Sequence, residues 1–77
     1  GWAIQVAQHA DEGDAARNVE TLRAAGLEAY RVVALVGGET VWRVRVGGYS
    51  SKEVATAAAP GVGSKAGASS TTVTPAP

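Results

Sequence analysis

The chain has 77 residues, which is enough for one small domain with a modest core and excludes a second independent domain. Seven basic and seven acidic residues give a formal net charge of zero, which excludes the strong positive field typical of proteins that bind duplex DNA or anionic membranes. Cysteine is absent, so disulfides, cysteine-bound metals and thiol catalysis are excluded, and no apolar run approaches the roughly 20 residues of a membrane span.

The first part of the chain predicts a strand followed by a helix. Residues 2–8 alternate large apolar side chains with smaller or polar ones, which is typical of a strand with one buried face. In residues 10–26 the apolar spacing becomes helical, with Asp11 placed as the N-cap and Gly26 at the usual position of a left-handed C-cap. The apolar positions of this helix are Ala15, Val19 and Leu22.

A hairpin and a second helix are predicted next. Residues 27–36 are rich in β-formers and are followed by two glycines, so a second strand should turn directly into a third at residues 41–46. Residues 50–59 predict a second helix, capped by Ser50 or Ser51. We expect this helix to be short, because Pro60 and Gly61 should end it.

The C-terminal segment differs in composition from the rest. Residues 60–77 are rich in Pro, Gly, Ala, Ser and Thr, and Lys65 is their only charged residue. We therefore divide the chain into a core of residues 1–59 and a flexible tail of residues 60–77. The β-branched residues near 70–74 favour one edge strand within that tail.

An internal repeat indicates the fold. A shift of forty residues places Trp2 on Trp42 and Ile4 on Val44, so one strand-helix-strand unit is used twice. Two such units predict an α+β, ferredoxin-like βαββαβ fold, with a four-stranded antiparallel sheet, both helices on one face and the two echoing strands at its centre. The side chains expected beneath the helices are Trp2, Ile4, Val6, Trp42, Val44 and Val46.

The uncovered face of that sheet is the candidate binding surface. Strand alternation assigns to it Ala3, Gln5, Ala7, Val41, Arg43 and Arg45. Two arginines and an amide on neighbouring central strands form a cluster of hydrogen-bond donors, although an ordinary solvated strand face is an equal alternative from the residues alone. His9 is expected at the surface or at the strand end, because neither a second histidine nor a cysteine supports a catalytic or metal role.

These residues resemble a known family. The run WAIQVAQHADEGDAARNVETLRAAGLEAY followed by WRVRVGGYSSKEVA is similar to the SPOR domain, the sporulation-related repeat of bacterial envelope proteins, over residues 2–59. The resemblance is carried by Ile4-Gln5-Val6-Ala7-Gln8-His9, Ala15, Leu22 with Gly26, and Arg43-Val44-Arg45-Val46-Gly47-Gly48-Tyr49. The sequence departs from the family pattern at Ala7-Gln8-His9 and at Gly48. The resemblance also implies an aromatic residue on the ligand face of the third strand, which would fall at Val41 or Trp42, and strand alternation favours Val41.

The resemblance implies binding without chemistry. The expected ligand is the glycan strand of peptidoglycan stripped of its peptides, which concentrates such proteins at division septa of the bacterial cell envelope. The glycan-binding residues it implies are Gln5, Ala7, Val41, Arg43 and Arg45. We expect an extracytoplasmic, monomeric fragment of a larger anchored or secreted protein, with envelope or cell-division proteins as further partners, and without cofactor, metal, nucleic acid or membrane contact.

Two alternatives to glycan binding stay open. The domain could be a protein-interaction or spacer module that has lost glycan affinity. It could also be a nucleic-acid binder, because RNA-recognition modules share this topology, although they stack bases on exposed aromatic residues of the central strands. An enzyme is not expected, because the sequence supplies no nucleophile with a matching base.

Overall fold

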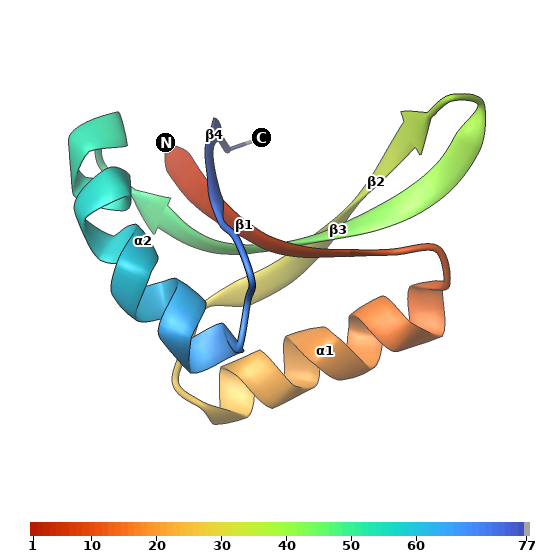
Figure 1. Cartoon of the computed structure of the whole chain (residues 1–77), viewed down its shortest axis with the longest axis horizontal. Coiled ribbons are helices and arrows are strands. Elements are labelled where there is room, and N and C mark those ends of the chain that lie inside the picture. The colour runs from red at the N-terminus through yellow and green to blue at the C-terminus, as the bar shows by residue number, and fades with distance from the viewer. Residues whose placement is uncertain (77) are drawn as a thin grey trace.

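The computed structural model describes residues 1–76 and has the predicted element order. The elements are β1 (Trp2–His9), α1 (Glu12–Ala24), β2 (Ala29–Val36), β3 (Glu39–Tyr49), α2 (Lys52–Ala66) and β4 (Thr72–Pro75). Figure 1 shows β1 and β3 crossing the middle of the molecule, with α1 beneath them and α2 beside β4. The order βαββαβ in one antiparallel sheet confirms the ferredoxin-like α+β fold.

The four strands lie in the order β2-β3-β1-β4. β1 and β3, the two strands related by the internal repeat, are therefore neighbours at the centre of the sheet, as the repeat predicts. β2 and β3 are joined by Gly37 and Gly38 alone, and both have positive φ angles, 58° and 80°. Two consecutive residues in this region match the twist of an antiparallel hairpin, and glycine adopts it without a steric penalty.

The core lies between one face of the sheet and the two helices. Ile4 and Val44 are fully buried, and Val46 is almost so. The other members of the core cluster are Val6, Ala15, Val19, Leu22, Ala29, Ala55, Ala59 and Val62. Trp2 and Trp42 are half-buried and pack against this cluster, so the prediction that both tryptophans lie on the covered face is confirmed.

The first helix begins and ends as predicted. Asp11 accepts a hydrogen bond from the backbone N–H of Asp14 at 2.9 Å and so caps the helix N-terminus. After the last turn, Gly26 has a φ of 88°, and the N–H of Leu27 donates to the carbonyl of Leu22 at 3.0 Å. Ala15, Val19 and Leu22 are the buried residues of this helix.

The second helix is not short, and the prediction that Pro60 and Gly61 end it is wrong. α2 spans 15 residues and crosses the expected division between residues 59 and 60. Pro60 and Gly61 lie on its exposed side, so the carbonyl left without a partner by Pro60 can be solvated. Its buried residues, Ala55, Ala59, Val62 and Gly63, continue the helical spacing through the proline and pack the helix on the sheet.

The C-terminal segment is built into the sheet. Gly67, with a φ of 64°, ends α2, and β4 then pairs antiparallel with β1, Val73 lying opposite Ile4. The edge strand expected near residues 70–74 is therefore present, at Thr72–Pro75. Pro77, the last residue of the expected tail, lies outside the described residues. Neither helix in residues 1–76 combines the length and apolar character needed to cross a membrane.

Candidate functional site

An irregularity in β1 decides which side chains reach the uncovered face. Gln5 lies opposite Arg45 and Ala7 opposite Val44, so Val6 is an extra residue with no partner of its own on β3. Such a bulge reverses the alternation beyond it. Val6 and Ala7 both contact the core, and Gln8, opposite Arg43, takes the place expected for Ala7. The expectation that Ala7 lies on the uncovered face is wrong.

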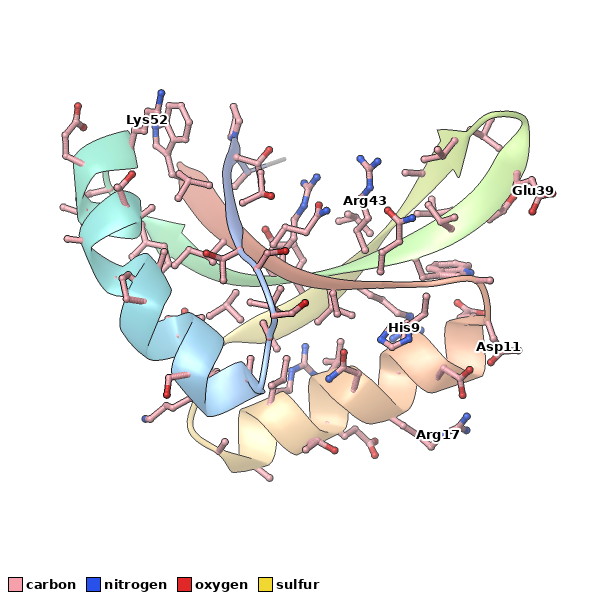
Figure 2. All side chains as sticks on the ribbon, in the orientation of Figure 1. His9, Asp11, Arg17, Glu39, Arg43 and Lys52 are labelled. Carbon is pink, nitrogen blue, oxygen red and sulfur yellow. The ribbon has the colours of Figure 1, made fainter. Side chains whose placement is uncertain are left out.

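Two arginine-glutamine pairs follow from this register. The guanidinium Nε of Arg45 donates to Oε1 of Gln5 at 3.2 Å, and Nε of Arg43 donates to Oε1 of Gln8 at the same distance. Figure 2 shows Arg43 pointing away from both helices, on the opposite side of the sheet from α1. The structure thus brings Gln5, Arg43 and Arg45 together on the uncovered face as predicted, and adds Gln8.

The electrostatics of these pairs favour an acceptor-rich ligand. Within residues 1–76, Arg43 and Arg45 have no ion-pair partner, whereas Arg17 pairs with Asp14 and Arg31 with Glu12. Each guanidinium donates through Nε to its glutamine, and its two terminal nitrogens make no hydrogen bond within residues 1–76. The surface therefore offers several free donors and two positive charges, the pattern that recognises a carboxylate among hydroxyl groups.

The part of the uncovered face toward the hairpin is apolar. Val41 lies opposite Ala34 on β2, and Val32 lies opposite Arg43. Cross-strand partners share a face, so Val41 is on the uncovered face as alternation predicts and presents an aliphatic side chain there. Ala3, also expected on this face, is fully buried and lies opposite Thr74, which leaves it no surface for a ligand.

The sequence reasoning missed an aromatic residue of this face, Tyr30. Tyr30 lies directly opposite Arg45 in the register of β2 and β3 and is half-buried. The signal was present, since Tyr30, Val32 and Ala34 alternate along residues 27–36 and could have been assigned to one face. A tyrosine ring beside a guanidinium supplies a flat apolar surface next to charged donors.

His9 and Arg31 belong to the covered side of the sheet, and His9 is the last residue of β1. His9 is the cross-strand partner of Trp42, and its ring Nε2 is 2.9 Å from Oδ1 of Asn18 on α1, so the ring links β1 to the helix (Figure 2). The guanidinium carbon of Arg31 lies 5.9 Å from the centroid of the Trp42 ring.

Residues 1–76 contain no cluster of three or more His, Cys, Asp or Glu side chains that could hold a metal ion.

Comparison with known families gives one match. The family model of the SPOR domain matches residues 1–74. The comparisons with curated proteins and with solved structures found no match. SPOR domains are known for peptidoglycan binding, are a binding family rather than a catalytic one, and occur in bacterial envelope proteins. Because the match covers nearly the whole chain, including most of the fourth strand, this chain belongs to the SPOR domain family.

Proposed function

We propose that this domain binds the glycan strands of peptidoglycan after their peptides have been removed, through the uncovered face of the sheet. The observation that carries the proposal is the pair of guanidinium groups of Arg43 and Arg45, which project from that face without a carboxylate partner in residues 1–76. Gln5 and Gln8 hold them in place. No chemical step is part of the proposed function.

The chemistry of a stripped glycan strand complements this surface. Removal of the peptide leaves a free lactyl carboxylate on every second sugar, and a guanidinium binds a carboxylate through charge-assisted hydrogen bonds. The amide N–H groups of Gln5 and Gln8 are available to sugar hydroxyl and acetamido oxygens. Each contact is worth only about 1 to 3 kcal/mol when lost, so affinity rests on several contacts together.

Tyr30 supports the proposal despite the departure at Val41. A sugar ring has apolar C–H faces that pack on aromatic rings. Although Val41 stands where the family pattern has an aromatic residue, Tyr30 places a ring on the same face, beside Arg45. The stacking surface proposed for the ligand is therefore on β2 rather than β3.

A sacculus binding assay tests the proposal. Purified sacculi are incubated with the protein before and after amidase treatment, which removes the peptides, and the retained protein is measured. We expect stripping to increase retention, because each removed peptide uncovers a carboxylate. The variant R43Q/R45Q should lose this increase, whereas R17Q/K65Q, which removes the same charge elsewhere, should keep it. Retention that stripping leaves unchanged contradicts the proposal.

A preference for stripped glycan predicts where the domain lies in the cell. Stripped glycan arises where amidases act, so the domain would concentrate its parent protein at the division septum. A fluorescent fusion of the domain, exported to the cell envelope, should form a band at midcell. The same fusion carrying R43Q/R45Q should spread along the cell outline.

A second candidate function has one observation in its favour. The β2-β3 hairpin exposes aliphatic side chains near its end, with Leu35 75% and Val33 58% exposed. Exposed apolar groups of this kind suit a contact with another envelope or cell-division protein. Capture of such a protein that survives R43Q/R45Q and is lost in L35S would favour this function. The RNA alternative lacks comparable support, because Tyr30 lies on the edge strand β2 rather than on a central strand.

A further inference from the structure

One row of side chains crosses all four strands of the uncovered face. Thr72 on β4 lies opposite Gln5 on β1, Gln5 lies opposite Arg45 on β3, and Arg45 lies opposite Tyr30 on β2. Neighbouring strands are about 4.8 Å apart, so the row extends roughly 14 Å across the sheet. It offers a hydroxyl, an amide, a guanidinium and an aromatic ring in succession.

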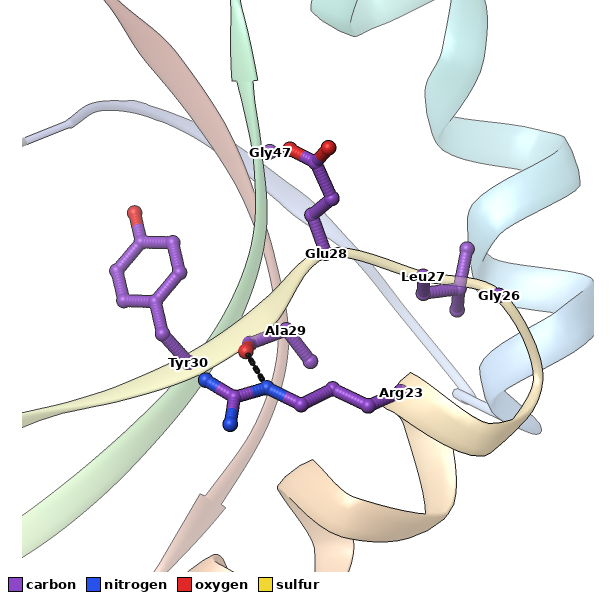
Figure 3. A pocket seen from close by; sticks show the side chains of 7 residues that line it. All are labelled: Arg23, Gly26, Leu27, Glu28, Ala29, Tyr30 and Gly47. Carbon is purple, nitrogen blue, oxygen red and sulfur yellow. Dashed lines mark hydrogen bonds between the residues drawn. The ribbon is translucent and has the colours of Figure 1, made fainter.

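Beyond Tyr30 the row ends at an open pocket on the outer edge of β2. The pocket measures about 550 Å³ and is lined by Arg23, Tyr30, Gly47 and the loop from Gly26 to Ala29. Figure 3 shows Glu28 and Tyr30 projecting to one side of the chain, while Arg23 reaches across from α1 beneath Tyr30. The pocket thus continues the row past the last strand.

Arg23 is held at this edge by a backbone contact. Its Nε donates to the carbonyl of Ala29 at 2.8 Å (Figure 3). The carbonyl of the preceding residue, Glu28, accepts from Gly47 of β3, so the carbonyl of Ala29 faces the outer edge. Arg23 therefore satisfies an edge carbonyl with Nε, while its terminal nitrogens make no hydrogen bond within residues 1–76.

The chemistry of the pocket suits a sugar that carries a carboxylate. The Tyr30 ring can pack on a sugar face, the free end of the Arg23 guanidinium can donate to a carboxylate, and the exposed Glu28 carboxylate can accept from hydroxyl groups. Arg23 lies beyond the outer edge of β2, about two strand spacings, or roughly 10 Å, from β3, the strand that carries Arg45. This spacing is comparable to the length of a disaccharide. Successive free carboxylates of a stripped strand are one disaccharide apart.

We propose that the Arg23–Tyr30 pocket is a second carboxylate-sugar subsite, and that the glycan strand runs across the β-strands along the row from Thr72 to Tyr30. This inference rests on the proposed glycan binding and adds a direction and an end point to it. Arg45 and Arg23 hold two successive carboxylates of one strand. Tyr30 packs against the sugar between them.

A titration with peptide-free glycan oligomers tests the inference. Isotope-labelled protein is titrated with a purified octasaccharide, and backbone amide shifts and affinity are measured. We expect the amides of residues 26–30 and of Gly47 to shift together with those of Gln5 and Arg45. The variants R23Q and Y30A should each weaken binding about tenfold, whereas R17Q, on the far side of α1 (Figure 2), should bind as the wild type does.

The outcomes separate the inference from the function on which it rests. If the octasaccharide shifts Gln5 and Arg45 but leaves residues 26–30 and Gly47 unmoved, and R23Q and Y30A keep wild-type affinity, the edge subsite is overturned and glycan binding stands. If the wild type shows no shifts with any oligomer, the proposed function falls and the subsite falls with it. The shift map uses the wild type alone, so a poorly folded variant does not decide the question.

Discussion

The two faces of this one sheet have opposite properties although they share the same strands. On the covered face, Ile4 and Val44 are completely buried beneath the helices. On the uncovered face, their chain neighbours Gln5 and Arg45 form a hydrogen-bonded pair that is only half-buried. The difference follows from the alternation of a strand, in which successive side chains point to opposite sides.

This contrast separates stability from recognition. The covered face contributes the apolar burial that stabilises the fold. The uncovered face contributes donors whose removal leaves the core intact. Substitutions on the two faces should therefore change different measured quantities, and the first and third of the following three predictions use that difference.

The largest effect is expected for Ile4→Ala on the covered face. Ile4 is fully buried in the core cluster, so its truncation leaves a cavity and lowers the free energy of unfolding by about 2 to 5 kcal/mol. Chemical denaturation measures this change in the free energy of unfolding. Gln5→Ala, one residue along, is the control and should change the unfolding free energy by less than about 0.5 kcal/mol. Equal losses in both variants would contradict the division of roles between the faces.

A smaller loss of stability is expected for Gly47→Ala, because Gly47 lies close to the Tyr49 ring and to the backbone of Trp2. Gly47 has a φ of 135°, and a Cβ there would lie 2.8 Å from the Tyr49 ring and 3.1 Å from the Trp2 carbonyl oxygen. We expect a loss of about 1 to 3 kcal/mol in thermal or chemical unfolding. Gly48→Ala is the matched control, since no atom lies within 4 Å of its added Cβ. A stable Gly47→Ala variant would show that this backbone conformation is not required.

The smallest expected effect is a loss of glycan binding at the bulge of β1. Gln8→Ala removes the partner of Arg43 from the uncovered face and should weaken glycan binding about threefold to tenfold, with little change in stability. Ala7→Gln should do the reverse, since it forces an amide against the core and lowers stability by about 1 to 3 kcal/mol. Titration and denaturation of both variants measure the two effects. If Ala7→Gln altered binding and Gln8→Ala did not, the register of β1 would be wrong.

The extent of the second helix shows where local sequence signals were insufficient. A proline followed by a glycine normally ends a helix, because proline lacks the N–H and clashes with the preceding turn. Here the apolar spacing of Ala55, Ala59 and Val62 continues past Pro60, and burial of that face outweighs the local cost. Gly63 is required for a separate reason, because a Cβ at this position would lie 2.9 Å from the Thr71 side chain.

The sequence alone determined the order of the elements, the caps of the first helix, the central position of the two repeated strands and the placement of Arg43 and Arg45 on one face. These properties depend on local spacing and on the period of a strand or helix, both of which are written in neighbouring residues. Only the tertiary structure decided that Gln8 rather than Ala7 joins them, that Tyr30 stands beside Arg45, and that Arg23 reaches the sheet edge. Those facts depend on how one strand is paired with another, and a bulge or a cross-strand neighbour exists only once the partner strand is in place.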